Sequence, residues 1–442
     1  MKQIISVILC VCAGMGCFAG EILTLEDART LALANSKSLS RYNLATEIAL
    51  LDERSQMYSN LPSLSLGISG SATLWGGDEF TDSLSAGASV GLNQTIWSGG
   101  KNSVLSAINK ISTEITRQDA IAEYFNVLDS VDSSYYGILQ SRASLDAAAA
   151  ALDTAALGLS IAEIRYEGGV ISPGDYLQAV AEHESKKTAQ NQAKRDLALS
   201  IAKLRSVTGL SSIPDLESID FENYETLIQG LSVLSDDETD TLFAALWTKL
   251  RTANPGLAKA ALQTEKSDKS VSLAKKDYFP SLSAGISTGL NYSYTNGFET
   301  SSGKLTISGN IPLDFWVTST SVNSKKLALE QSLLDYSSAE SSLDLEVRTG
   351  LLDCIAQASS VISSRKAAEY AQKHFENQLE LYKLAQASVS ELSDAAALLS
   401  SNQTQLIKAQ YGFLSCLSVI RSLGAFESED QVILFLLPVS QR

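Results

Sequence analysis

Few residues in this chain have the types and spacing that catalysis or metal binding requires. His183 and His374 are the only histidines among the 442 residues, and neither has the several ligands nearby that a metal site needs. The chain also lacks a Ser–His–Asp spacing, a phosphate-binding glycine loop and a cysteine with a histidine near it in sequence. The sequence therefore predicts a protein that is not an enzyme and holds no cofactor or metal, with both histidines on solvated helix faces.

The carboxylates suggest a different chemistry, which is the control of ion passage. Glu391 and Asp394 lie three residues apart at the start of a predicted helix. If three copies of the chain converged there, these side chains would form acidic rings that attract cations and repel anions. The alternative is that they only cap and solubilise the helix start, where negative charge is favourable. Both interpretations stay open on this basis.

Two blocks of alternating residues, 62–97 and 280–316, predict four β-strands. Apolar residues alternate with Ser, Thr and Gly, so each strand has one apolar and one small polar face. Each strand has about ten residues or more, which is enough to cross a membrane when tilted. Aromatic residues cluster at the strand ends, as at membrane interfaces. They are Tyr58, Trp97, Tyr278, Phe279, Phe315 and Trp316 at one end and Trp75, Phe80, Tyr292, Tyr294 and Phe298 at the other.

The alternative is a soluble β-sandwich, although its polar surface would be unusually small and weakly charged. In lipid, four strands leave unpaired edges and are too few to close a barrel. Two copies would give roughly eight strands, whose interior side chains fill, and three would give roughly twelve. Because the interior residues are small, a trimer with a passage is favoured.

Long helical hairpins follow each strand block. Apolar residues step by three and four from Lys101 to Glu163, which predicts a helix of about 60 residues, roughly 90 Å long. A return helix runs from Asp175 to Thr208, and a second pair covers 319–384 and 391–423. Shorter helices are predicted over 25–60 and 240–277. A soluble coiled-coil scaffold is the alternative, but it would not need the strand blocks.

The order of predicted elements occurs twice, which indicates a tandem repeat. The predicted segments are a signal peptide (1–19), a first repeat (20–210, with strand pair 63–97 and hairpin 101–209), an acidic surface connector (211–240), a second repeat (241–425, with strand pair 281–316 and hairpin 319–424) and a C-terminal tail (426–442).

The N-terminus has the features of an export signal. Lys2 precedes an apolar run that ends in small residues before Gly20. A short membrane anchor and a lipidated Cys17 are the alternatives. No later apolar run is expected to be long enough for a membrane-spanning helix.

The net charge and the cysteines indicate which partners and which disulfides to expect. The formal net charge of −16 argues against a nucleic-acid partner. Only Cys354 and Cys416 follow the signal. Two buried free thiols are favoured over a disulfide, because neighbouring helix axes lie about 8–10 Å apart.

Four motifs occur in order along the chain: LTLEDA at 23–28, LPSL at 61–64, WSGGK at 97–101 and RYEGGVISPGDYL at 165–177. Together they resemble the TolC-like outer membrane efflux proteins. The second repeat departs from the family pattern. Residues 315–318 lack the Gly-Gly turn, and Ala385 stands in place of the tip glycine.

The resemblance implies a mainly helical homotrimer with a twelve-stranded transmembrane β-barrel in the outer membrane and an α-barrel across the periplasm. It implies a periplasmic adaptor (membrane fusion) protein and an inner-membrane pump as partners, in efflux or type I secretion. The alternative is a non-conducting structural or adhesive protein of the cell envelope. Drugs, metals and polypeptides are not distinguished as cargo.

The resemblance also implies a gate at the hairpin tips. The tip turn falls on Tyr166, Gly169 and Ser172. The gate positions are Asp175, Tyr382, Glu391 and Asp394. An arginine that links neighbouring chains in the family falls on Ala387 here, which leaves that link without its side chain.

Overall fold

The computed structural model describes residues 22–73, 83–293, 297–384 and 386–437. The predicted signal peptide, Cys17, Trp75, Phe80, Tyr294 and Ala385 lie outside the described residues. The chain forms two compact units. The hairpin unit comprises the segments up to Ser40, Ile121–Pro255 and from Ser341 onward, and the sheet unit comprises Arg41–Ala120 and Gly256–Glu340.

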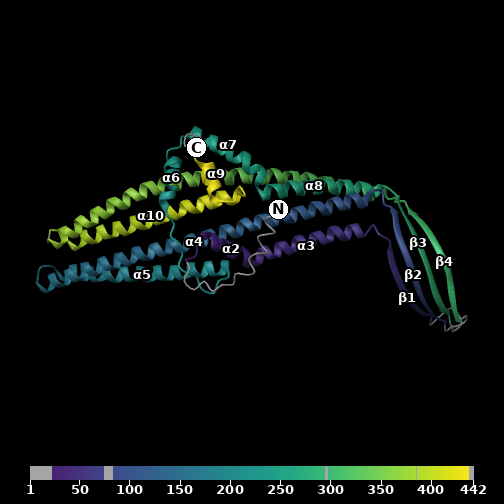
Figure 1. Ribbon diagram of the computed structural model, residues 1–442, viewed down its shortest axis with the longest axis horizontal. Helices are drawn as coiled ribbons and strands as arrows, with labels where there is room; N and C mark the ends of the chain where they lie inside the picture. The colour runs from purple at the N-terminus through teal and green to yellow at the C-terminus, as the bar shows by residue number, and fades with distance from the viewer. Residues whose placement is uncertain (1–21, 74–82, 294–296, 385, 438–442) are drawn as a thin grey trace. The chain divides into compact units, whose positions relative to one another are not determined.

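Helices and strands follow one another in an order that occurs twice (Figure 1). The first series is α2 (Leu25–Asn35), α3 (Lys37–Tyr58), β1 (Ser63–Thr73), β2 (Ser83–Trp97), α4 (Lys101–Glu167) and α5 (Pro173–Thr208). After η2 (Phe221–Tyr224) and α6 (Glu225–Ser232), the second series is α7 (Asp236–Ala253), α8 (Pro255–Lys275), η3 (Lys276–Tyr278), β3 (Ser281–Ser293), β4 (Gly297–Asn310), α9 (Phe315–Lys383) and α10 (Val389–Leu423). The last described helix is α11 (Glu429–Leu436).

The sheet unit contains one antiparallel sheet in the order β1-β2-β3-β4. Its register places apolar residues opposite one another, since Leu92 pairs with Leu64 on one side and Ile286 on the other. These apolar side chains are open to the surroundings: Leu64 is 75% and Ile68 82% exposed. A continuous exposed apolar face is what lipid-facing strands present. Within the described strands, β1 and β4 each leave one edge unpaired.

The opposite face of the sheet is small and polar, and it is closely packed. Gly91 lies between Ser65 and Ser287 in the register. A methyl group on Gly285 would clash with Oδ1 of Asn93. Glycine at this position therefore leaves room for the asparagine on the neighbouring strand.

The predicted end of the fourth strand is wrong. The alternation predicts a strand through Phe315, but β4 ends at Asn310 and α9 begins at Phe315. Pro312 has no N–H to give to a strand ladder, so pairing stops before it. The carbonyl of Asp314 then accepts the N–H groups of Val317 and Thr318 at 3.0 and 3.3 Å. Phe315 and Trp316 thus lie in the first turn of a helix.

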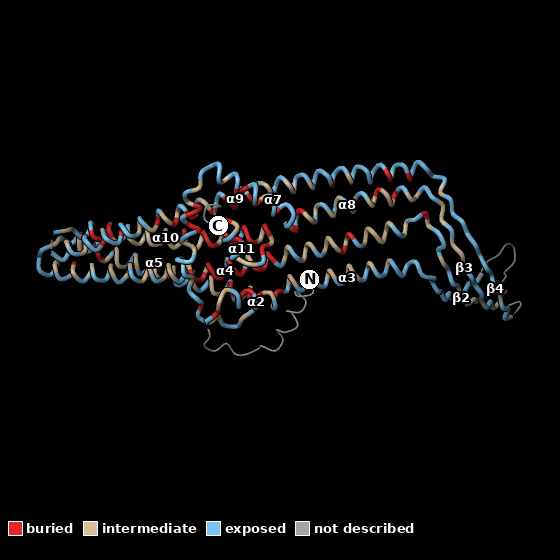
Figure 2. Tube along the Cα trace, turned by 45° about the horizontal axis from the view of Figure 1, so that its top comes forward, coloured by how far each residue is buried: buried red, intermediate tan, exposed pale blue. Residues whose placement is uncertain are grey.

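Most buried residues of the hairpin unit gather where α2, α4, α10 and α11 meet (Figure 2). A buried charge cluster joins them. Asp132 on α4 accepts hydrogen bonds from Arg29 on α2 at 2.7 and 2.9 Å. It also lies 2.7 Å from Nη2 of Arg421 on α10 and accepts from Ser418 at 2.8 Å. Two guanidinium groups and a hydroxyl compensate the desolvated carboxylate.

The predicted surface connector is only partly a surface segment. Within it, α6 buries Leu227, Ile228 and Leu231, and α7 already begins at Asp236. The acidic residues that suggested a solvated segment lie beside an apolar helix face, which packs inward. The predicted tail likewise contains α11, with Val432 and Leu436 buried.

The expectation that no later apolar run is long enough for a membrane-spanning helix is also wrong. Among the described helices, α4 has a stretch that is long and apolar enough to cross a membrane by length and composition, although only 6% of that stretch is buried. The helix includes the alanine run 147–151, and alanine raises mean hydropathy without adding large side chains.

Candidate functional site at the hairpin tips

The first hairpin reverses through a turn that requires glycine. Gly169 has φ +70°, a backbone conformation that other residues adopt only with strain. Its N–H donates to the carbonyl of Tyr166 at 3.0 Å, and Val170 donates to Arg165 at 2.8 Å. These bonds satisfy the last carbonyls of α4.

A capping box begins the return helix α5. The Asp175 N–H donates to Oγ of Ser172 at 3.2 Å, and the Ser172 N–H donates back to the Asp175 carboxylate at 3.2 Å. Tyr166 stacks on Tyr176, with ring centroids 5.0 Å apart. The predicted tip residues Tyr166, Gly169 and Ser172 thus lie together, and Asp175 is fixed beside them.

The second tip has the same construction at α10. Glu391 N–H donates to Oγ of Ser388 at 3.2 Å, and Ser388 N–H donates to the Glu391 carboxylate at 2.7 Å. The backbone hydrogen bond from Ser388, joined by one from its hydroxyl, lowers the pKa of Glu391 below its usual value. Asp394 follows three residues later and is exposed. The structure therefore gives Glu391 a capping role, and the acidic ring stays a prediction.

Tyr382 occupies a position unlike those of the carboxylates. Its side chain is fully buried in a cluster with Phe375, Leu392 and Ala395, and Ile161 of α4 packs against this cluster. Burial raises the pKa of Tyr382. Its hydroxyl has no hydrogen-bond partner among the described residues. The ring therefore contributes packing between α9, α10 and α4.

Arg165 completes the contact between the two hairpins. Its guanidinium carbon lies 4.3 Å from the centroid of the Tyr382 ring. Its Nη2 donates to the Tyr382 carbonyl oxygen. A cation over an aromatic face and a charged hydrogen bond thus join the last turn of α4 to the last turn of α9.

Sequence reasoning missed Arg165 as a functional residue and noted only the missing side chain at Ala387. The available signal was its position in the last turn of α4, at the same level as Tyr166 of the tip. A guanidinium is therefore present at the tips, but it comes from the first hairpin.

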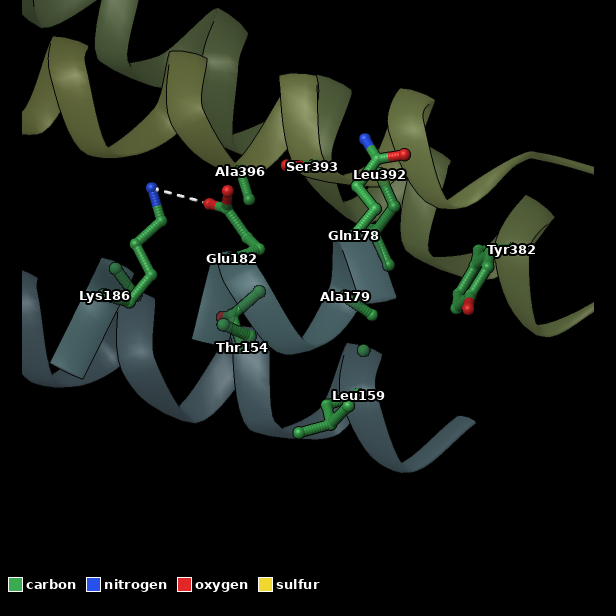
Figure 3. Close-up of a pocket in the computed structure, with 13 residues that line it drawn as sticks. Thr154, Leu159, Gln178, Ala179, Glu182, Lys186, Tyr382, Leu392, Ser393 and Ala396 are labelled. Carbon is green, nitrogen blue, oxygen red and sulfur yellow. Dashed lines mark ion pairs between the residues drawn. The ribbon is translucent and has the colours of Figure 1, made fainter. Parts of the chain in front are cut away.

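Figure 3 shows side chains of both hairpins that line a small space between them. A pocket of about 30 Å³ lies among Gly158, Gln178, Tyr382 and Leu392, from four different helices. That volume suits about one or two water molecules. At its edge Lys186 forms an ion pair with Glu182 at 3.0 Å.

Each histidine contacts a side chain on its own helix. Nδ1 of His183 lies 3.4 Å from Glu184, and the His374 ring stacks on Tyr370 with centroids 5.8 Å apart. Across the part of the chain that the structure describes, no three His, Cys, Asp or Glu side chains are placed to hold a metal ion.

Comparison with known proteins adds independent information. The family model described as outer membrane efflux protein matches residues 28–210 and 246–422. Outer membrane protein TolC of Escherichia coli is 22% identical in an alignment 375 positions long, which covers 78% of this chain and 71% of TolC.

Solved structures share the fold. The CmeC outer membrane channel of Campylobacter jejuni superposes with a TM-score of 0.76 at 16% identity, over 95% of this chain and 90% of CmeC. The outer membrane protein VceC of Vibrio cholerae gives 0.73 at 15% identity, over 90% of this chain and 96% of VceC. The match over both repeats shows that this chain belongs to the outer membrane efflux protein family, as an outer membrane protein whose helices extend into the periplasm.

Proposed function

We propose that three copies of this chain form an export duct through the outer membrane and into the periplasm. Each copy contributes its four strands to one β-barrel of about twelve strands. The duct conducts passively, while an inner-membrane pump supplies the energy and a periplasmic adaptor connects the two. The predicted signal peptide, residues 1–19, is removed during export in this proposal.

One observation carries the proposal, namely an open four-stranded sheet with an exposed apolar face. Leu64, Leu92 and Ile286 continue this face from strand to strand. In lipid, the unpaired N–H and C=O groups of β1 and β4 would each cost several kcal/mol. Pairing β4 of one copy with β1 of the next removes both edges.

The inner surface of such a barrel would carry Ser, Gly and Asn. Examples are Ser65, Gly91 and Asn93, which alternate with the apolar positions. Small neutral groups of this kind leave an open aqueous passage and recognise no particular solute. The proposal therefore assigns the duct a broad cargo rather than one substrate.

The proposed gate lies at the periplasmic hairpin tips. Three copies of Glu391 and Asp394 would form acidic rings that hinder anions. Asp175 would flank them from the first hairpin. Contact between Arg165 and Tyr382 would hold the two hairpins of each copy together in the closed state.

Ion conductance in planar lipid bilayers tests this gate. We expect the double variant E391A/D394A to conduct more than the wild type and to lose cation preference, because the acidic rings are gone. The matched control is E346A/E427A, which removes two exposed carboxylates away from the tips. Equal conductance and equal selectivity in all three proteins would reject the gate assignment.

The same recordings separate the duct from the alternative function. A structural or adhesive envelope protein would assemble and insert without conducting in any variant. Assembled, membrane-inserted protein that passes no current even after the tip substitutions would favour that alternative.

A further inference from the structure

Cys354 on α9 and Cys416 on α10 face each other across the second hairpin. Flanking contacts fix this register. A methyl group on Gly350 would lie 3.7 Å from Ile420, and one on Gly412 would lie 3.0 Å from Gln357. Cys354 lies four residues after Gly350, and Cys416 lies four residues before Ile420. In an antiparallel pair, these contacts on either side place the two cysteines at the same level.

The two glycines also bear on whether α9 and α10 are close enough for a disulfide. Ordinary helix axes lie about 8–10 Å apart, which is far for a disulfide. Gly350 and Gly412 carry no side chain into the space between α9 and α10, so the helices can approach more closely at this level. The two thiols are close enough to shift each other's pKa.

The thiols differ in environment and in ionisation. In the structure both thiols are free, as the sequence predicts, but only Cys354 is buried and Cys416 is half-buried. The hydrogen bond from the Cys354 thiol lowers the pKa of Cys416, because it stabilises the Cys416 thiolate. The same bond and burial raise the pKa of Cys354. Cys416 is therefore the more readily ionised thiol of the pair.

A disulfide also requires an oxidising compartment. The helices of this family extend into the periplasm, where thiols within reach of each other become oxidised. We infer that Cys354 and Cys416 form a disulfide in the cell, which links α9 to α10 across the second hairpin. This inference does not depend on the export function and requires only that both helices face an oxidising compartment.

The oxidant would be a protein disulfide of the periplasm. The Cys416 thiolate attacks one sulfur of that disulfide, which forms a mixed disulfide and releases a thiolate. The released thiolate takes the proton of Cys354. The resulting Cys354 thiolate attacks the Cys416 sulfur, closes the bond and releases the second sulfur of the partner. Two electrons pass to the partner, which leaves as a dithiol once its second thiolate is protonated.

The bond would enclose residues 355–415, which include the second tip with Glu391 and Asp394. Within this loop α9 and α10 could not slide past each other. If the proposed gate opens, the second hairpin would then move as one body.

Cleavage at the tip tests the disulfide. A protease recognition sequence inserted between Gln386 and Ala387 allows the exported protein to be cut after its free thiols are blocked with N-ethylmaleimide. We expect the two fragments to stay together on a denaturing gel without reductant and to separate with it. The single variants C354S and C416S serve as controls and should separate in both cases.

Mass spectrometry of the uncut protein adds a measurement that needs no insertion. We expect no N-ethylmaleimide on the denatured wild type before reduction and two adducts after it. Full alkylation of both cysteines in the unreduced, exported protein would overturn the inference. So would purified reduced protein that forms only a glutathione adduct on Cys416 when treated with oxidised glutathione, because Cys354 would then not reach it.

Discussion

Tyr382 illustrates how one side chain can hold two helical hairpins together. Its ring is buried between α9, α10 and α4, and the guanidinium of Arg165 lies over its face. Its hydroxyl, in contrast, has no hydrogen-bond partner among the described residues. The ring therefore stabilises the tip, and the hydroxyl contributes little.

This distinction predicts different effects for two substitutions. Y382A removes the buried ring and should lower the free energy of unfolding by about 3–5 kcal/mol, as large-to-small core substitutions do. Y382F keeps the ring and should change that free energy by less than about 1 kcal/mol. Thermal or denaturant unfolding in detergent measures both. A loss in Y382F as large as in Y382A would show that the hydroxyl matters after all.

Glu429, at the start of α11, is a candidate for pH dependence. It accepts a hydrogen bond from Tyr224 at 2.9 Å and lies 3.6 Å from Arg29. Burial outweighs these contacts and raises the pKa of Glu429 above its usual value. Between the unfolded and folded pKa values, the folded protein holds a proton that the unfolded chain has released. Stability should therefore fall as pH rises through that window.

Replacing Glu429 tests this sign. E429Q cannot ionise, so its unfolding free energy should depend less on pH than that of the wild type from about pH 4.5 upward. The control E427Q removes an exposed carboxylate two residues away and should leave the wild-type slope. Unfolding midpoints between about pH 4 and 7 measure the slopes. A steeper slope in E429Q would contradict the assignment.

At the scale of elements, Asp132 joins helices from both repeats. It links Arg29 of α2 and Arg421 of α10 to α4 in a buried cluster. Asp132 is fully buried. Helices distant in the sequence thus share one compensated charge.

Removing Asp132 should be costly because it leaves two buried guanidinium groups without their common partner. D132A is expected to lower the free energy of unfolding by about 3–5 kcal/mol. The control R142A breaks the exposed ion pair with Asp215, 2.9 Å apart, and should cost no more than about 1 kcal/mol. Denaturant titrations compare the two variants, and equal effects would show that the cluster adds no special stability.

The sequence predicted best those elements that depend on neighbouring residues alone. The alternation around Leu64 and Leu92 predicted strands because the faces of a strand depend on neighbouring residues alone. The alternation placed the end of β4 at Phe315, although Pro312 suggested an edge or an earlier end of the strand. The helix α6 was missed because acidic residues obscured its apolar face. The contact of Arg165 with Tyr382 joins residues 217 positions apart. No pattern in the sequence around either residue predicts that the two side chains meet.

At the scale of the whole molecule, one chain is incomplete as a membrane protein. Its sheet has an exposed apolar face and two unpaired edges within the described strands. A soluble protein would cover that face, and a membrane protein must pair those edges. In the proposed assembly, lipid covers that face, further copies pair the edges, and the small side chains of the polar face leave a passage.

The number of chains per particle tests the proposal most directly. Native mass spectrometry of the purified protein, released from lipid nanodiscs, counts them without reference to conductance or gating. The shared barrel predicts particles of three chains that persist at low protein concentration. A stable, lipid-inserted single chain, or a particle with two chains, would contradict it.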